Sequence, residues 1–317
     1  MYWISVRGVS GDTFTNDPSD LGKTRYLVVP HGQTPRPGHA IKPSAWLKAV
    51  MAHFPPDKNG KRWGDIVFFV HGYNNTVENV ALRQKLLAEG LESAGFDSLV
   101  ISFDWPSGDT ALGYLDDRHD ATITAFRLVD DAIRLFLNVR DENCFINIHV
   151  VAHSMGAFLV REAFRDADNT SASVAWTANQ VVFVAGDVSS SSLATGNTIS
   201  DGLYNHSQRL TNYFSYMDQP LQTSNLKRLG LAPRVGRVGL PENTPASALD
   251  VNCTARFRVL GQDVLDAVTG DPTHSWYFHD PQWLQDLAFT LAGKIDRNAI
   301  PTRERASSVE NDFSLSA

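Results

Sequence analysis

Three short runs of the chain are almost entirely apolar, and they constrain the fold more than any other feature. They are DIVFFVHG at 65–72, INIHVVAH at 146–153 and QVVFVAG at 180–186. A strand in the middle of a parallel sheet is buried on both faces and has this composition. Longer segments with helical periodicity separate these runs along the chain. The alternation therefore predicts an α/β protein with a mostly parallel sheet and helices on both faces.

Further runs complete the expected sheet and its helical layers. Together with the three runs above, five more predict an eight-stranded sheet: 2–8, 24–30, 98–105, 210–217 and 255–261. Helices are expected at about 77–94, 115–140 and 281–295, and another at or just after Ser154. Asn75 and Glu78 are placed to start the first helix, since their side chains can satisfy the free amides of its first turn.

The pattern also predicts how the chain is divided. No second series of strands and helices is visible, so we expect a single domain over residues 1–299. The segment 300–317 is polar and lacks apolar periodicity, which predicts a flexible C-terminal tail. The connection at 187–210 has room for a helix but not for a large lid.

Charge and cysteine content narrow the classes of function. The 317 residues carry 28 basic and 35 acidic side chains, a formal net charge of -7, so neither nucleic acid nor an anionic membrane is an expected partner. Cys144 and Cys253 lie outside any CxxC spacing and predict reduced thiols rather than a disulfide framework. The N-terminus, MYWISVRGVSG, lacks a long apolar stretch, so we expect a cytoplasmic protein without membrane insertion.

Motifs for metals and phosphate-bearing cofactors are missing from the sequence. No HExxH motif or paired histidine spacing occurs, and neither do Walker-type or dinucleotide-binding glycine patterns. We therefore expect neither a metal nor a cofactor. The sequence leaves the oligomeric state open.

Ser154 lies where an apolar run meets the next helical segment, within VVAHSMGAF at 150–158. A strand that turns sharply into a helix exposes the side chain at the apex beside the free amides of the helix, and it needs small residues two places before and after. Ala152 and Gly156 meet this need, with alanine where glycine is more common. The pattern favours a reactive serine, although serine is also a good N-cap residue without chemistry.

Three longer stretches extend the likeness beyond this turn. They are VFFVHGYNNTVENVALRQ (67–84), ISFDWPSGDTALGYLDDR (101–118) and VVAHSMGAFLVREAF (150–164), followed by FVAGDVSSS, YFSYMDQPL and THSWYF. Together they resemble the α/β hydrolase superfamily, and within it a bacterial group of serine hydrolases whose function is mostly unknown. The resemblance covers about residues 65–290. It implies an α/β-hydrolase fold with an eight-stranded, mostly parallel sheet and a serine nucleophile, and it implies no particular substrate.

A serine nucleophile needs a base and an acid, which in this fold follow it along the chain. His274 lies in the loop GDPTHSWYF, where the superfamily places its base, whereas His206 and His279 have the character of surface histidines. Asp218 ends the run LTNYFSYM and is the preferred acid because open parallel sheets carry their sites at this edge. Asp187, one strand earlier, stays open as an alternative acid or as a structural carboxylate. Less favoured acids are Asp250, Asp263, Asp266 and Asp271.

Two backbone amides are expected to hold the negative oxygen that forms during acyl transfer. Met155 supplies one from the helix N-terminus, and Tyr73 supplies the other from His71-Gly72-Tyr73, which resembles the superfamily's HG-x motif. His71 itself is expected to orient this loop by hydrogen bonding. A second HG pair at His31 is set aside because no helix follows it. The aromatic side chains of Tyr73, Trp105 and Trp276 are candidates to line the substrate pocket, against the alternative of core packing.

These residues predict a serine hydrolase that cleaves a small-molecule carboxylic ester through an acyl-enzyme. The same triad also serves thioesters and amides, so a thioesterase or amidase is the nearest alternative. Dehalogenases and epoxide hydrolases of this fold generally need an aspartate at the position of Ser154. A non-catalytic binding protein on the same fold is the alternative from another class.

Overall fold

The computed structural model describes residues 1–18, 23–108, 114–137, 142–169, 176–226, 232–306 and 312–317. Within these residues the main sheet has eleven strands, in the order β12-β13-β11-β10-β9-β8-β6-β7-β1-β4-β5. The strands from β13 to β1 run parallel, whereas β12, β4 and β5 pair antiparallel at the two edges. The α/β-hydrolase fold expected from the sequence is thus present, with a larger sheet than expected.

The strands of the main sheet are β1 (Tyr2–Ser5), β4 (Arg25–Val28), β5 (Ala40–Ile41), β6 (Arg62–Val70), β7 (Leu99–Asp104), β8 (Cys144–His153), β9 (Gln180–Val184), β10 (Leu210–Phe214), β11 (Ala248–Asn252), β12 (Arg303–Arg305) and β13 (Asp312–Leu315). A separate hairpin pairs β2 (Val9–Ser10) with β3 (Thr13–Phe14). Seven of the eight predicted strands correspond to β1, β4, β6, β7, β8, β9 and β10.

The helices are α1 (Pro43–Met51), α2 (Val77–Ser93), α3 (Tyr114–Arg127), α4 (Arg134–Leu137), α5 (Met155–Asn169), α6 (Asp201–Asn205), α7 (Gln219–Leu226), α8 (Val235–Val238), α9 (Thr254–Arg258), α10 (Gln262–Ala267), α11 (Pro272–Ser275) and α12 (Pro281–Ala292). A π-helical turn, Leu128–Ile133, joins α3 to α4, and short 3₁₀ turns occur at Pro37–His39, Ser190–Leu193 and Trp276–His279. None of the helices in the described ranges is both long and apolar enough to cross a bilayer.

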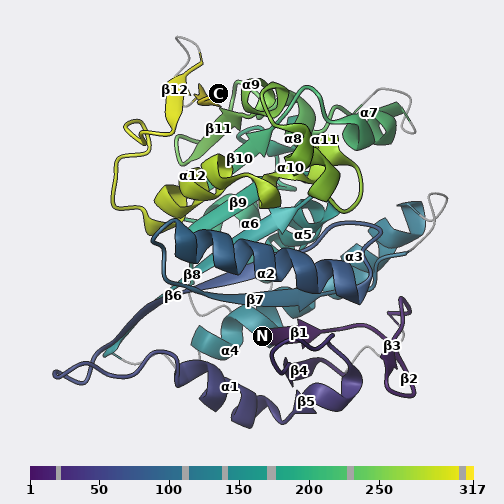
Figure 1. Ribbon diagram of the computed structural model, residues 1–317, viewed down its shortest axis with the longest axis vertical. Helices are drawn as coiled ribbons and strands as arrows, with labels where there is room; N and C mark the ends of the chain where they lie inside the picture. Colours follow the sequence, from purple (N-terminus) through teal and green to yellow (C-terminus); the bar gives the residue numbers. More distant parts are fainter. Residues whose placement is uncertain (19–22, 109–113, 138–141, 170–175, 227–231, 307–311) are drawn as a thin grey trace.

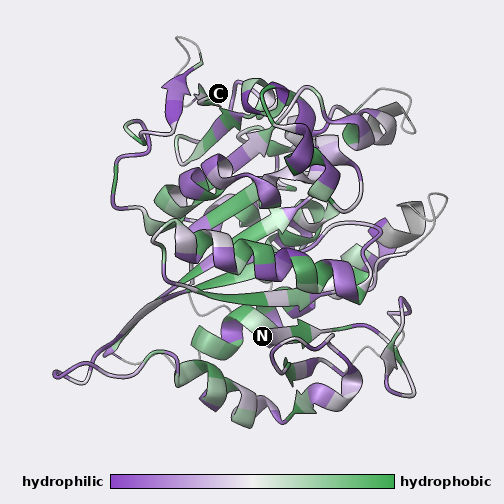
Figure 2. Cartoon of the chain, viewed as in Figure 1, coloured by the Kyte–Doolittle hydropathy of each residue, from purple (hydrophilic) through white to green (hydrophobic). Residues whose placement is uncertain are grey.

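Each face of the sheet has its own hydrophobic core. In β6, Ile66 and Phe68 pack on one face and Val67 and Phe69 on the other, because successive side chains of a strand point to opposite sides. The first core includes α1, α3, α5 and α6, and the second includes α2 and α12, which cross in front of the sheet in Figure 1. Figure 2 shows the hydrophobic colour concentrated on the central strands, whereas the helices carry both hydrophobic and hydrophilic residues.

The prediction of an eighth strand at 255–261 is wrong. Most of that segment is the helix α9, and the strand that pairs with β10 is β11, just before it. The alternation in ARFRVLG imitates a half-buried strand, but Arg256 instead forms an ion pair with Asp280 at 2.7 Å. In β11 the central Asp250 hides the strand pattern, although its carboxylate accepts a hydrogen bond from Asn212 of β10 at 2.7 Å.

In its described part, 300–306 and 312–317, the C-terminal segment forms two strands rather than the flexible tail that its composition predicted. β13 pairs in parallel with β11, and β12 pairs with β13. Phe313 and Leu315 are buried in the second core, and the guanidinium of Arg303 forms a buried ion pair with Asp286 at 2.7 Å. An existing sheet needs few apolar residues to bind one more strand, so polar composition alone is a poor guide to disorder here.

The start of α2 also differs from the prediction. The N-cap is Thr76, whose hydroxyl accepts a hydrogen bond from the amide of Asn79 at 3.3 Å. Asn75 lies one residue earlier and binds the preceding loop instead. No large lid is present among the described residues between β9 and β10, where the 3₁₀ turn Ser190–Leu193 and α6 make the connection.

Candidate active site

Ser154 forms the apex of a tight turn between β8 and α5. Its φ of 56° lies in the left-handed region, which is uncommon for residues other than glycine. The turn is fixed on both sides, because the Ser154 amide donates to Val184 at 3.0 Å and its carbonyl accepts from the Asp187 amide at 2.8 Å. A Cβ on Gly156 would lie 2.3 Å from the Val70 carbonyl oxygen, so this position must stay glycine.

His274 and Asp218 meet at the same edge of the sheet. Nδ1 of His274, in α11, lies 2.6 Å from Oδ2 of Asp218, which directly precedes α7. Asp218 is fully buried, and its Oδ1 accepts the Leu221 amide at 2.9 Å. Burial raises the pKa of Asp218, although the interaction with His274 favours the ionised form. A carboxylate held in this way keeps the proton of His274 on Nδ1 and leaves Nε2 as an acceptor.

The backbone of His274 contacts the residue next to Ser154. Nε2 of His153 lies 3.0 Å from the carbonyl oxygen of His274, and the two rings are 4.7 Å apart. Burial lowers the pKa of His153 well below the ordinary value, and the neighbouring His274 and Arg83 lower it further. His153 is therefore a neutral donor to that carbonyl.

In the described part of the chain no hydrogen bond joins the Ser154 hydroxyl to His274. Catalytic hydrogen bonds are often long in the absence of a substrate and tighten when it binds. We therefore expect the hydrogen bond between the Ser154 hydroxyl and His274 to form when a substrate binds.

The alternative acid, Asp187, has another partner. Its Oδ1 lies 3.0 Å from Nε of Arg234 and accepts the Ser224 hydroxyl at 3.2 Å. Both members of the ion pair are almost fully buried, and a buried guanidinium needs a carboxylate nearby. Asp187 thus has a structural partner in Arg234, which fits its alternative interpretation as a structural carboxylate.

The less favoured candidates lie in other surroundings. Asp271 caps α11 by accepting the Thr273 amide at 2.8 Å, and Asp266 accepts from Gln262 on the surface. His206 is not a surface residue as expected but is buried, with its ring stacked on Trp176 at 4.3 Å. His279 is partly buried, and burial lowers its pKa.

The loop after β6 passes directly over Ser154. A Cβ on Gly72 would lie 2.6 Å from the Cβ of Ser154 and 3.2 Å from its hydroxyl oxygen, so only glycine fits there. Tyr73 follows in the chain, and Met155 is the first residue of α5, where amides lack partners within the helix. Met155 thus follows the serine directly in the chain, and Tyr73 follows the glycine that lies against the serine.

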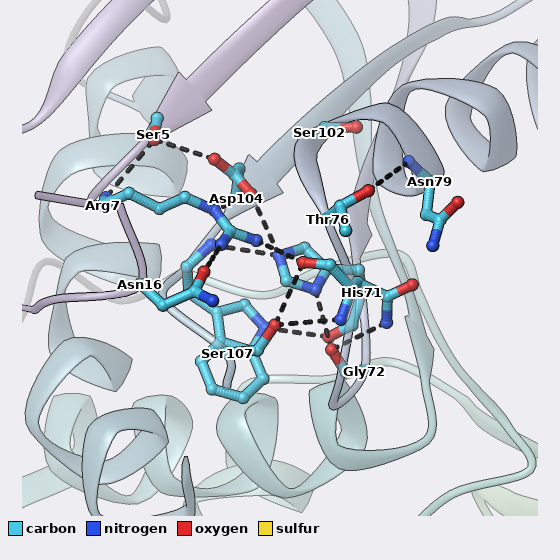
Figure 3. A network of polar contacts seen from close by, with 12 residues as sticks. Ser5, Arg7, Asn16, His71, Gly72, Thr76, Asn79, Ser102, Asp104 and Ser107 are labelled. Atoms are coloured by element: carbon cyan, nitrogen blue, oxygen red, sulfur yellow. Dashed lines mark hydrogen bonds and ion pairs between the residues drawn. The ribbon is translucent and has the colours of Figure 1, made fainter. Parts of the chain in front are cut away.

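His71 is buried beneath this loop in a polar network, part of which Figure 3 shows. Its Nδ1 donates to the Gly72 carbonyl at 2.8 Å, and its Nε2 lies 3.2 Å from both the Trp105 amide and Oδ1 of Asp104. Asp104 also accepts from Ser5 at 2.8 Å and from Arg7 at 2.7 Å. Burial opposes ionisation of Asp104, but Arg7 and His71 lower its pKa to about 2. Burial lowers the pKa of His71.

Trp105 and Trp276 do not line an accessible pocket, contrary to the sequence-based expectation. Both are fully buried. The ring of Trp105 stacks on His71 and its indole N–H donates to the His71 carbonyl at 2.8 Å, whereas Trp276 stacks on Tyr277 at 4.3 Å. Their size and apolar surface are used in packing, which was the alternative interpretation. Tyr73 remains partly exposed.

Sequence reasoning missed the supporting residues His153, Asn75 and Arg83. The turn pattern around Ser154 makes no demand on the residue type at His153. Arg83 carried a signal that could have identified it, because it is three residues after Val80 and four before Leu87, on the buried stripe of α2. A charged residue on an apolar stripe indicates a buried polar contact.

No group of three or more His, Cys, Asp or Glu side chains in the described ranges is arranged to hold a metal ion. The fold and the serine turn define an α/β hydrolase. The chain belongs to the family described as alpha/beta hydrolase of unknown function (DUF900), which matches residues 49–271.

Several solved structures are similar to this chain in fold. The dienelactone hydrolase from Anabaena variabilis has 18% identity, a TM-score of 0.38 and coverage of 74% of this chain and 84% of its own. The alpha/beta hydrolase domain-containing protein 10 from mouse has 13% identity, a TM-score of 0.35 and coverage of 74% and 90%. A Trichoderma reesei cutinase has 12% identity, a TM-score of 0.32 and coverage of 78% and 86%. No curated protein sequence matches the chain.

Proposed function

We propose that this protein is a serine hydrolase that cleaves carboxylic esters, with Ser154 as nucleophile, His274 as base and Asp218 as acid. The observation that carries the proposal is the 2.6 Å contact between His274 and the buried Asp218. His274 also contacts His153, the residue before a serine held at a φ of 56°. Strained backbone at a polar residue is a common feature of active sites. Asp187 is excluded from the proposed triad because Arg234 pairs with it.

The proposed reaction follows from these positions. Oγ of Ser154 attacks the ester carbonyl carbon while Nε2 of His274 takes the hydroxyl proton, and the carbonyl oxygen becomes negative. The amides of Tyr73 and Met155 donate to that oxygen. His274 then returns the proton to the departing alcohol, and a water molecule activated by the same histidine releases the acid. Asp218 stabilises the imidazolium that forms in both halves of the reaction.

The proposed substrates are small-molecule esters with short acyl groups. The connection between β9 and β10 contains only short helical turns in its described part and forms no large lid, which favours accessible substrates over lipid droplets. A panel of chromogenic esters of increasing acyl length tests this proposal. A clear preference for long-chain triglyceride emulsions would contradict it.

Labelling with a fluorophosphonate probe tests the proposed chemistry directly, because the probe needs an activated serine and no particular acyl group. We expect stoichiometric labelling at Ser154 and hydrolysis of short-chain esters. Faster turnover of matched thioesters or amides would assign the same triad to a thioesterase or amidase. A folded protein that neither reacts with the probe nor hydrolyses any of these substrates would indicate a non-catalytic binding protein.

A further inference from the structure

The peptide unit that joins Gly72 to Tyr73 is held by two side chains. Its carbonyl oxygen accepts from Nδ1 of His71 at 2.8 Å and from Nδ2 of Asn75 at 3.0 Å. A trans peptide is planar, so its N–H points away from its C=O. Fixing the Gly72 carbonyl therefore fixes the direction of the Tyr73 amide, the proposed oxyanion donor.

The side chain of Asn75 is itself held in one orientation. Its Nδ2 donates to both the Gly72 and the Tyr73 carbonyls, the latter at 2.8 Å, while its Oδ1 accepts from Nη1 of Arg83 at 2.8 Å. A guanidinium can only donate, so it selects the oxygen end of the amide and turns the nitrogen end toward the loop. Arg83 thus determines which group Asn75 presents to the peptide unit.

The other end of Arg83 reaches the loop that carries the proposed base. Its Nη2 donates to the Ser275 hydroxyl at 3.1 Å and to the Thr269 carbonyl at 3.2 Å. Ser275 is the residue after His274. One guanidinium therefore connects the oxyanion loop to the histidine loop, which are far apart in the sequence.

Burying the guanidinium of Arg83 at this place lowers the stability of the fold. It is only 8% exposed, and none of the carboxylates in the described ranges forms an ion pair with it. Burial lowers its pKa to about 10. Its guanidinium carbon lies 5.8 Å from the centre of the Phe278 ring, where an apolar side chain would pack without this cost. Buried groups that lower stability are characteristic of functional sites.

We infer that Arg83 is a positioning residue of the proposed hydrolase, which acts through Asn75 to aim the Tyr73 amide at the oxyanion and holds this loop in register with the His274 loop. The inference rests on the proposed function. Arg83 does not touch the reacting atoms in this role. It should therefore affect the turnover rate more than substrate binding.

The test compares Arg83→Met, Asn75→Ala and the double variant with wild type. Removing one oxyanion donor typically costs about 10²–10³ in kcat, and a misdirected donor should cost less. We expect each single variant to lower kcat by about tenfold to a hundredfold with KM within about threefold, and the double variant to be no slower than the slower single variant. An unchanged kcat in Arg83→Met, or additive losses in the double variant, would overturn the inference.

The pH profile distinguishes this role from a direct effect of the Arg83 charge on the base. If Arg83 acts through the loop, the midpoint of the kcat/KM profile stays where it is in wild type. A shifted midpoint with an undiminished maximal rate would mean that Arg83 acts on His274 by its charge, and that the inference is wrong. Arg303→Met is the matched control, since it removes a buried arginine remote from both loops.

Hydrogen exchange tests the inference without any activity. In Arg83→Met and in Asn75→Ala, amides of the segment 71–76 should exchange at least about tenfold faster than in wild type, relative to amides of the central strands β8 and β9 in the same variant, whereas in Arg303→Met the two groups of amides should change together. Unchanged exchange of this segment in both variants would overturn the inference. Failure of the proposed function looks different, because wild type would then lack ester hydrolysis and probe labelling while the exchange result still stands. If Arg83→Met does not fold, Asn75→Ala supplies the same test without disturbing a charge.

Discussion

Nδ1 of His274 lies 2.6 Å from Oδ2 of Asp218, across a sequence separation of 56 residues. The second oxygen of Asp218 accepts a backbone amide from α7, so the carboxylate cannot rotate away without losing that bond. His274 is held from the other side by His153, which donates to its carbonyl. The pair is thus fixed before any substrate arrives, and each member of the proposed triad can be tested by its own substitution.

Ser154→Ala should abolish ester hydrolysis and probe labelling and leave the fold intact. The change removes one oxygen and leaves the hydrogen bonds of the turn, which are made by the backbone. Activity assays, intact-protein mass spectrometry after labelling and thermal unfolding measure the three effects. Ser207→Ala is a matched control, because among the described residues the Ser207 hydroxyl binds only the Leu203 carbonyl, four residues earlier. Labelling that persists in Ser154→Ala would refute the assignment.

His274→Ala should remove the activity, whereas His279→Ala should keep most of it. Only neutral imidazole can accept the serine proton, so a histidine base requires kcat/KM of the wild type to fall in acid. The measurement is a kcat/KM profile for wild type and both variants. The opposite ranking of the two variants would mean that the base is His279.

Asp218→Asn and Asp187→Asn should have opposite consequences. The first loses the charge that stabilises imidazolium, which in a serine protease lowers kcat about 10⁴-fold, so we expect a loss of at least about a hundredfold with little change in Tm. The second leaves Arg234 buried without its carboxylate, which typically costs about 3–5 kcal/mol of stability. Its kcat should stay within about tenfold of wild type.

Steady-state kinetics and thermal unfolding of the two aspartate variants separate these outcomes. Because the amide of Asp187, not its side chain, binds the Ser154 carbonyl, the turn should survive the substitution. An inactive but stable Asp187→Asn beside an active Asp218→Asn would move the acid to the end of β9.

Asp250 should make stability depend on pH in the neutral range. Burial raises its pKa to about 7, although hydrogen bonds from Asn212 and the Leu240 amide favour ionisation. In the unfolded chain the value is about 3.9, so the folded state keeps a proton that the unfolded state has lost between these pH values. The contribution of Asp250 is complete below about pH 4 and is lost as the pH rises through about 7.

The Tm of the wild type should therefore contain a component that falls between about pH 4 and about pH 7. Asp250→Asn cannot ionise, and its Tm should fall less over this range, whatever its absolute stability. Differential scanning calorimetry across the range measures both slopes. Equal slopes for the two proteins would show that Asp250 ionises in the folded state as it does in the unfolded chain.

Arg303→Met should destabilise the protein without changing turnover. The guanidinium lies in a buried cluster with Asp286, Tyr213 and Thr290, and losing it leaves the fully buried carboxylate of Asp286 without its cation. Breaking a buried pair typically costs about 3–5 kcal/mol. Tm and kcat of the variant measure the effect, and an unchanged Tm would mean that the buried Arg303–Asp286 pair contributes nothing net to stability.

Local patterns determined those parts of the fold whose physical cause is local. The apolar runs of β6, β8 and β9 follow from burial on both faces of the sheet, and the turn at Ser154 follows from small residues at Ala152 and Gly156. Asp218 and His274 could be selected as partners because both follow elements that end at one edge of a parallel sheet. The sequence could place them at that edge but could not show that they touch.

Long-range pairing decided the rest. Asp218 contacts His274, whereas Asp187 pairs with Arg234. Arg234 lies 47 residues further along the chain than Asp187, and no local pattern predicts their contact. β11 and β13 are strands because β10 and then β11 offer edges to them, although their own sequences are polar enough to resemble loops. The role of Arg83 on α2 depends on its hydrogen bonds to Asn75 and Ser275, which lie in two different loops. Such contacts depend on which groups are left unsatisfied when distant segments meet, so only the tertiary structure could decide them.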